Sequence, residues 1–63
     1  MTAEQFIRAV EIDKRLRQLR RQHRQLTANK AKATYDRAVQ AYDRRLAAND
    51  EETNKLKQEI ERL

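Results

Sequence analysis

The stretch YDRAVQAYDRRLAANDEETNKLKQEIERL, residues 35–63, decides the fold of this 63-residue chain. Its apolar and small polar residues recur in alternating steps of four and three, the heptad pattern of a helix that packs on another helix. This seam consists of Tyr35, Val39, Tyr42, Leu46, Asn49, Thr53, Leu56, Ile60 and Leu63. Two neighbouring members, Asn49 and Thr53, are polar. A buried polar seam residue costs stability and often fixes register or partner number.

The first half of the chain carries a second seam with the same spacing. It consists of Ala9, Ile12, Leu16, Leu19, His23 and Leu26. Phe6, Ile7 and Val10 lie outside this seam and widen the apolar face near the N-terminus. A wider apolar stripe predicts contact with more than one neighbour at that end.

The composition favours helix from end to end. The chain contains no glycine, proline, serine or cysteine, and most of what remains are strong helix formers. Charged residues make up 40% and the net charge is +5, a combination that disfavours a packed core. Because the apolar period is regular, we still expect ordered helix in a single all-α domain over residues 1–63.

The two seams are out of phase, so the chain either turns or changes its contact face between them. The phase break falls across residues 27–31, where Asn29 suits the left-handed conformation that ends helices. We predict an antiparallel helical hairpin or coiled coil, with helices over 3–27 and 31–63. Two alternatives stay open: a corner at 48–50, where an aspartate would cap a new helix, and one continuous helix of roughly 95 Å.

Charge counts slightly against the hairpin. Residues 1–13 and residues 50–63 both carry a net negative charge. In a hairpin these two segments meet at the open end, where acid against acid is mildly unfavourable.

The core that these seams can build is small. Such a core rarely supplies more than roughly 3–5 kcal/mol, and without cysteine there is no disulfide to add to it. We therefore expect self-association into a dimer or a higher helical bundle. The candidate self-association seam is Ile12, Leu16, Leu19, His23, Leu26, Tyr35, Val39, Tyr42, Leu46, Leu56, Ile60 and Leu63.

The basic segment KRLRQLRRQHR, residues 14–24, is the sharpest local feature. Arginine presents a planar fork that suits phosphate groups. The candidate phosphate or anion contacts are Arg17, Arg20, Arg21 and Arg24. Two interpretations stay open: a solvated face or one that pairs with acids of a neighbouring helix, and binding to a nucleic-acid backbone with little sequence specificity.

Residues for catalysis are nearly absent. The chain has no serine or cysteine nucleophile and no glycine-rich phosphate loop,. The only histidine, His23, lies on a seam and is interpreted as a packed polar residue, and Tyr35 and Tyr42 as core packing. We expect no enzymatic activity, no cofactor, no metal site and no small-molecule substrate.

The sequence also bears on location. No apolar run is long enough to span a membrane. The first ten residues lack the basic start and the continuous apolar stretch of a signal peptide. We therefore expect a cytoplasmic protein without membrane contact.

The opening MTAEQFIRAVEIDKRLRQLRRQ combines a Met-Thr-Ala start, an acidic and amide pair, an aromatic residue and the element Ile12-Asp13-Lys14-Arg15. It resembles the start of small phage and prophage proteins of Gram-positive bacteria, the ArpU-like late-transcription regulators. The ending LKQEIERL, Leu56 to Leu63, looks like a later helix of that family. About half of the chain is covered, and no sigma-like DNA-reading region follows. The resemblance implies a small phage-encoded helical protein that binds host factors.

These observations predict a non-enzymatic interaction or regulatory protein, encoded by a phage or another mobile element. It would act by binding another protein, from the host or the phage. The alternative is a nucleic-acid-binding helical dimer that contacts phosphates through its arginine ridge.

Overall fold

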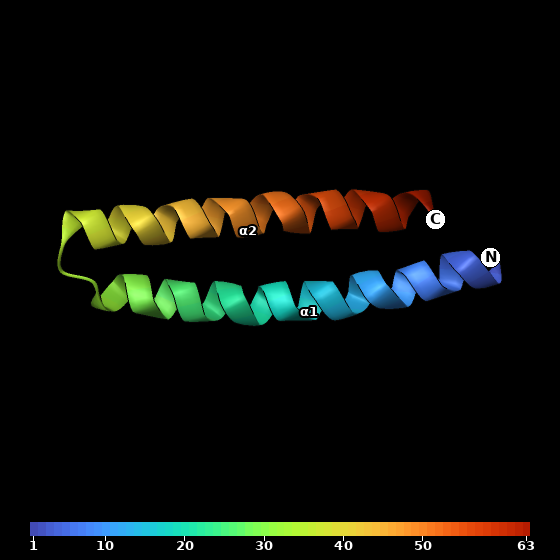
Figure 1. Ribbon diagram of the computed structural model, residues 1–63, viewed down its shortest axis with the longest axis horizontal. Helices are drawn as coiled ribbons and strands as arrows, with labels where there is room; N and C mark the ends of the chain where they lie inside the picture. The colour runs from blue at the N-terminus through green and yellow to red at the C-terminus, as the bar shows by residue number, and fades with distance from the viewer.

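The computed structural model describes all 63 residues and consists of two helices, α1 (Ala3–Lys32) and α2 (Asp36–Arg62). The helices lie side by side and antiparallel, so that both chain ends lie at the same end of the rod (Figure 1). The molecule measures 50 × 15 × 11 Å, about half the length of one continuous helix. The predicted all-α antiparallel hairpin is confirmed, and the continuous helix is not formed.

The start of α1 is fixed by a capping box. The Gln5 backbone N–H donates to the Thr2 hydroxyl oxygen at 3.2 Å, and the Thr2 N–H donates to the Gln5 side-chain oxygen at 2.9 Å. This exchange satisfies two of the donors that a helix start leaves open. Glu4 in the first turn and Lys30 and Lys32 in the last suit the helix dipole,.

The turn lies at residues 33–35, whereas the sequence predicted it at 27–31. The predicted turn is helical because the inner face of α1 continues one turn beyond Leu26. Asn29 and Lys30 extend that face and are half-buried. The phase break in the sequence therefore lies before the true end of α1, and it placed the turn too early.

The chain reverses through extended backbone. Ala33 has φ −72° and ψ 132°, and Tyr35 has φ −100° and ψ 134°. No residue has a positive φ, so the left-handed residue that Asn29 was expected to supply is not used. Tyr35 begins α2 without a side-chain cap, which is why the sequence shows no signal for this helix start.

The core is one row of side chains on the inner face of α1. Ile12, Leu19 and Leu26, seven residues apart, are 0%, 1% and 7% exposed. Half-buried side chains that complete the predicted seam are Leu16, Val39, Tyr42, Leu46, Leu56 and Leu63. These residues pack within one chain, and self-association stays a prediction.

Three residues of the predicted seam are exposed. The His23 side chain is 47% exposed, and Tyr35 and Ile60 are 78% and 38% exposed. Tyr35 belongs to the turn instead of the seam, and Ile60 lies near the open end of the hairpin.

Neither helix contains an apolar stretch that would reach across a bilayer.

Candidate interaction surface

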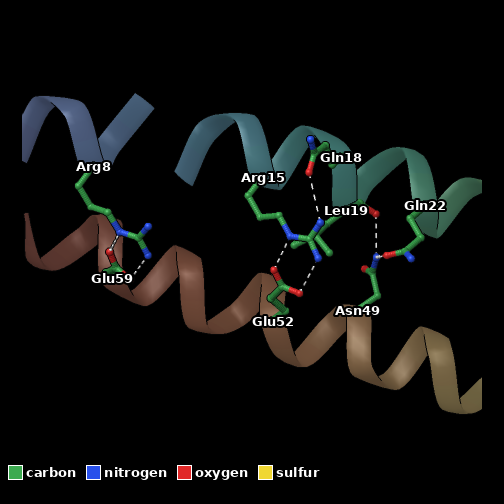
Figure 2. Close-up of polar contacts among 8 residues, drawn as sticks. All are labelled: Arg8, Arg15, Gln18, Leu19, Gln22, Asn49, Glu52 and Glu59. Carbon is green, nitrogen blue, oxygen red and sulfur yellow. Dashed lines mark hydrogen bonds and ion pairs between the residues drawn. The ribbon is translucent and has the colours of Figure 1, made fainter. Parts of the chain in front are cut away.

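A buried asparagine sets the register of the two helices. The Asn49 side-chain N–H₂ donates to the Leu19 carbonyl at 2.8 Å and to the Gln22 side-chain oxygen at 3.2 Å (Figure 2). Asn49 is 5% exposed, and a slip of one helix would leave its buried amide unpaired, at a cost of about 1–3 kcal/mol. The alternative corner at 48–50 is wrong, because α2 continues through it.

Asn49 is polar because its amide pairs with α1 across the seam. This contact agrees with the register-fixing role expected of a polar seam residue. Its acceptor Gln22 was not identified from the sequence. Gln22 is one of several glutamines on an exposed part of α1, and no spacing distinguishes it from the others.

Two bidentate ion pairs border one side of the seam. Arg8 binds Glu59 through Nε and through Nη2, the latter at 2.9 Å. Arg15 binds Glu52 through Nε at 2.5 Å and Nη2 at 2.9 Å. Figure 2 shows both arginines reaching from α1 to α2. The hydrogen bonds from the arginines hold the pKa values of Glu52 and Glu59 below the ordinary value.

The same hydrogen bonds raise the pKa values of Arg8 and Arg15 above the arginine value. Sequence reasoning missed these pairs. The signal was present, since both partners recur at a spacing of seven beside the seam. This signal was missed because charges were added over whole segments. Both segments at the open end are negative in sum, but Arg8 of α1 binds Glu59 of α2 there.

The opposite side of the seam carries two more contacts with the same spacing. Lys30 pairs with Asp43 at 2.5 Å, and His23 lies 3.6 Å from Asp50. No group of three or more histidine or acidic side chains that could hold a metal ion occurs. Polar contacts thus border the seam on both sides, with Asn49 buried between them.

The outer face of α1 begins with an apolar patch, defined here as Phe6, Ile7 and Val10. These side chains are 61%, 58% and 40% exposed. Their spacing of three and four places them together on a helix. The first turns of α1 extend beyond the end of α2 (Figure 1), and the patch lies on the side of α1 that faces away from α2. The wider apolar stripe expected from the sequence is present and is uncovered.

The four predicted arginines lie together beyond the patch. Arg17, Arg20, Arg21 and Arg24 line one shallow surface hollow, and we call them the arginine cluster. Arg17 pairs with Asp13 at 3.1 Å. The other three form no ion pair within the chain.

A groove between the helices adjoins the arginine cluster. It has a volume of about 350 Å³. Its lining comprises Leu16, Arg20, His23, Arg24, Asn49, Asp50, Thr53 and Lys57. The small seam residue Thr53 leaves this space unfilled. The groove extends the positive surface from α1 toward α2.

The patch and the cluster belong to one face. From Val10 the chain reaches Lys14, Arg17, Arg21 and Arg24 in steps of four, three, four and three, and all are exposed. Residues at these steps form a continuous strip along a helix. The strip from Phe6 to Arg24 is about 27 Å long. One end is apolar and the other is cationic.

Comparisons with protein families, with curated proteins and with solved structures found no match to this chain. The resemblance of the first residues to the phage regulators therefore stays a prediction. What can be said of function follows from the surface of the hairpin itself.

Proposed function

We propose that this chain is a non-enzymatic binding protein that acts by attaching another protein to the outer face of α1. The observation that carries the proposal is the exposure of Phe6, Ile7 and Val10. Large apolar side chains are scarce here: only Ile12, Leu19 and Leu26 are buried, whereas Phe6, Ile7 and Val10 are left in water. Clustered exposed apolar residues with a polar rim mark interaction sites.

The other helix supports this assignment by contrast. The exposed residues of α2 include no apolar side chain larger than alanine except Ile60. The uncovered apolar surface thus belongs to α1. Such a division suits a hairpin in which α2 holds α1 straight and α1 meets the partner.

The size of the core supports a binding role as well. Four of 63 residues are buried, and a core of this kind rarely supplies more than roughly 3–5 kcal/mol. A partner that binds only the folded hairpin would stabilise it by mass action. If the chain is the phage-encoded regulator that its opening residues resemble, that partner would be a host or phage protein.

Photo-crosslinking tests the proposal. A photoreactive phenylalanine analogue replaces Phe6 in one variant and Gln58, on α2, in the other, in cells that encode this chain. We expect one protein to be labelled from position 6 and not from position 58. The double substitution Phe6→Ser and Ile7→Ser should abolish binding of that protein after purification. Equal labelling from both positions, or none, would contradict the proposal.

A second candidate is binding to a nucleic-acid backbone. It rests on the gathering of the arginine cluster around one hollow, with Arg20, Arg21 and Arg24 unpaired. Titration with unrelated RNA and DNA duplexes at two salt concentrations tests it. The candidate predicts binding that weakens steeply with salt, and Ala at positions 17, 21 and 24 should flatten that dependence. No binding at low salt removes it.

A further inference from the structure

Building on the proposed function, we infer that the partner is an acidic amphipathic helix that lies along the outer face of α1. Its apolar side chains cover the apolar patch, and its carboxylates meet Lys14 and the arginine cluster. The proposed function requires only that the patch binds a protein. The inference adds the chemistry and the shape of that protein's binding segment.

The shape follows from the straightness of the strip. Phe6, Val10, Arg17 and Arg24 follow one another at helical spacing over about 27 Å, roughly five turns,. A second helix can lie along such a strip and present side chains at the same three and four spacing. An irregular loop would not match contacts repeated over that length.

The charge follows from cations with a repeat of seven, of which only Arg17 forms an ion pair within the chain, with Asp13. Lys14 and Arg21 are seven residues apart, and so are Arg17 and Arg24. On the inner side of the same helix, Arg8 and the arginine seven residues later each bind a glutamate of α2 in bidentate fashion. The cations of the outer face have the same spacing of seven, but no acidic helix lies opposite them.

A second copy of this chain is a poor occupant. The acids that form no ion pair within the hairpin are Glu4, Asp36 and Glu61. All three lie near helix ends, so they do not match a row of cations along the middle of α1. The exposed side of α2 also carries only one apolar side chain larger than alanine, Ile60, too few to cover the patch.

Nucleic acid and an anionic membrane fit less well than an acidic protein. Glu4, Glu11 and Asp13 are three or four residues from members of the apolar patch and are exposed. They would face phosphates wherever the patch approached a polyanion. A nucleic-acid backbone also makes no use of Phe6 and Ile7, whereas an amphipathic helix uses both halves of the strip.

Three helical peptides of about 21 residues, roughly 30 Å long, test the inference by fluorescence anisotropy. Each carries leucines at heptad spacing in one half, and the other half carries glutamates, glutamines or lysines. We expect the glutamate peptide to bind most tightly, with an affinity that falls with salt. The glutamine peptide should bind about tenfold more weakly, and the lysine peptide more weakly still.

Charge reversal on the hairpin makes the test specific. The double substitution Arg17→Glu and Arg24→Glu should reverse the preference, so that the lysine peptide binds more tightly than the glutamate peptide. The matched control is Arg37→Glu with Arg44→Glu, which like Arg17 and Arg24 are exposed and seven residues apart, but lie on α2 and form no ion pair. The control should keep the original preference, and circular dichroism confirms that both variants remain helical.

Every other outcome overturns the inference, and these outcomes differ in whether the proposed function is overturned with it. Equal binding of the three peptides, or none, overturns it while crosslinking from Phe6 still supports the proposed function. Tighter binding to duplex DNA or to anionic vesicles than to the glutamate peptide, unaffected by Phe6→Ser, overturns both. Displacement of the peptide by unlabelled hairpin at its self-association concentration identifies a second copy as the occupant.

Discussion

The inner and outer faces of α1 both carry large apolar side chains, but only the inner face meets another helix. Ile12, Leu19 and Leu26 are nearly or fully buried against α2, whereas Phe6 and Ile7 are more than half exposed. The inner face is also bordered by complete ion pairs, while most cations of the outer face have none. The inner face of α1 is thus a packed interface, and its outer face is an uncovered surface of similar character.

This difference separates the residues that stabilise the fold from the residues that we propose bind a partner. Residues of the inner face hold the hairpin together and should be sensitive to substitution in stability. Residues of the outer face stabilise little and should be sensitive in binding. The predictions below test this separation, beginning with the largest effect.

Truncating the inner face should cost the most. Leu19→Ala removes a side chain that is 1% exposed, and such changes cost about 2–5 kcal/mol. This is comparable to the most that a core of this size usually contributes, about 3–5 kcal/mol. We expect the far-ultraviolet circular dichroism signal of the hairpin to be largely lost at 25 °C. Val10→Ala, on the outer face, is the control, and similar melting curves for the two variants would contradict the separation.

The buried asparagine should give the next largest effect. Asn49→Ala removes the donor to Leu19 and Gln22, and we expect a loss of about 1–3 kcal/mol. Asn49→Leu should melt at a higher temperature but populate several species in sedimentation, because the polar contact that fixes register is gone. Asn54→Ala, exposed on the same helix, should change neither property. A single species for Asn49→Leu would show that register is set elsewhere.

The ion pairs should make stability fall in acid. The pKa values of Glu52 and Glu59 are lowered in the folded hairpin by hydrogen bonds from Arg15 and Arg8. Their contribution is therefore complete above the ordinary value of 4.5 and is lost as pH falls through the lowered folded values,. Glu52→Gln with Glu59→Gln should flatten the melting temperature against pH below that value.

The effect of these pairs should be modest and sensitive to salt, because all four side chains are partly in water,. Glu61→Gln, at an acid without an ion pair, is the control for the acid limb and should leave it unchanged. An equally steep acid limb in the double variant would assign the pH dependence to other groups.

The outer face should give the smallest effect on folding. Phe6→Ser and Ile7→Ser act on exposed side chains, and we expect the free energy of unfolding to change by about 0.5 kcal/mol or less. Chemical denaturation measures this change, and binding of the crosslinked partner should be lost in the same protein. A large loss of stability would mean that the patch belongs to the core.

The amino-acid sequence predicted the inner face well and the turn poorly, and the reason lies in how each is encoded. A seam repeats its signal over many turns, so one ambiguous position such as Asn49 does not obscure it. A turn is encoded once. Here residues 33–35 turn the chain, with ordinary extended backbone at Ala33 and Tyr35. Of the three, only Thr34 is a residue type that sequence rules associate with loops, and one threonine alone is no turn signal.

The candidate surface was predicted in parts. The spacing of Arg17, Arg21 and Arg24 was enough to place them away from the seam, because helical periodicity fixes direction. Phe6 and Ile7 were placed outside the seam by the same periodicity. Whether a second neighbour covers them is not encoded in that spacing, and the single helix that the chain supplies packs on the opposite face of α1.

A distance between labels at Glu4 and Glu61 tests the central claim most directly, since one chain must fold back on itself to leave the outer face of α1 open. The doubly labelled chain is diluted into an excess of unlabelled chain, which excludes distances between copies. The hairpin predicts a separation close to that of packed helix axes, about 8–10 Å plus the reach of the labels. A separation of roughly 85 Å, the span of one continuous helix, would contradict the account.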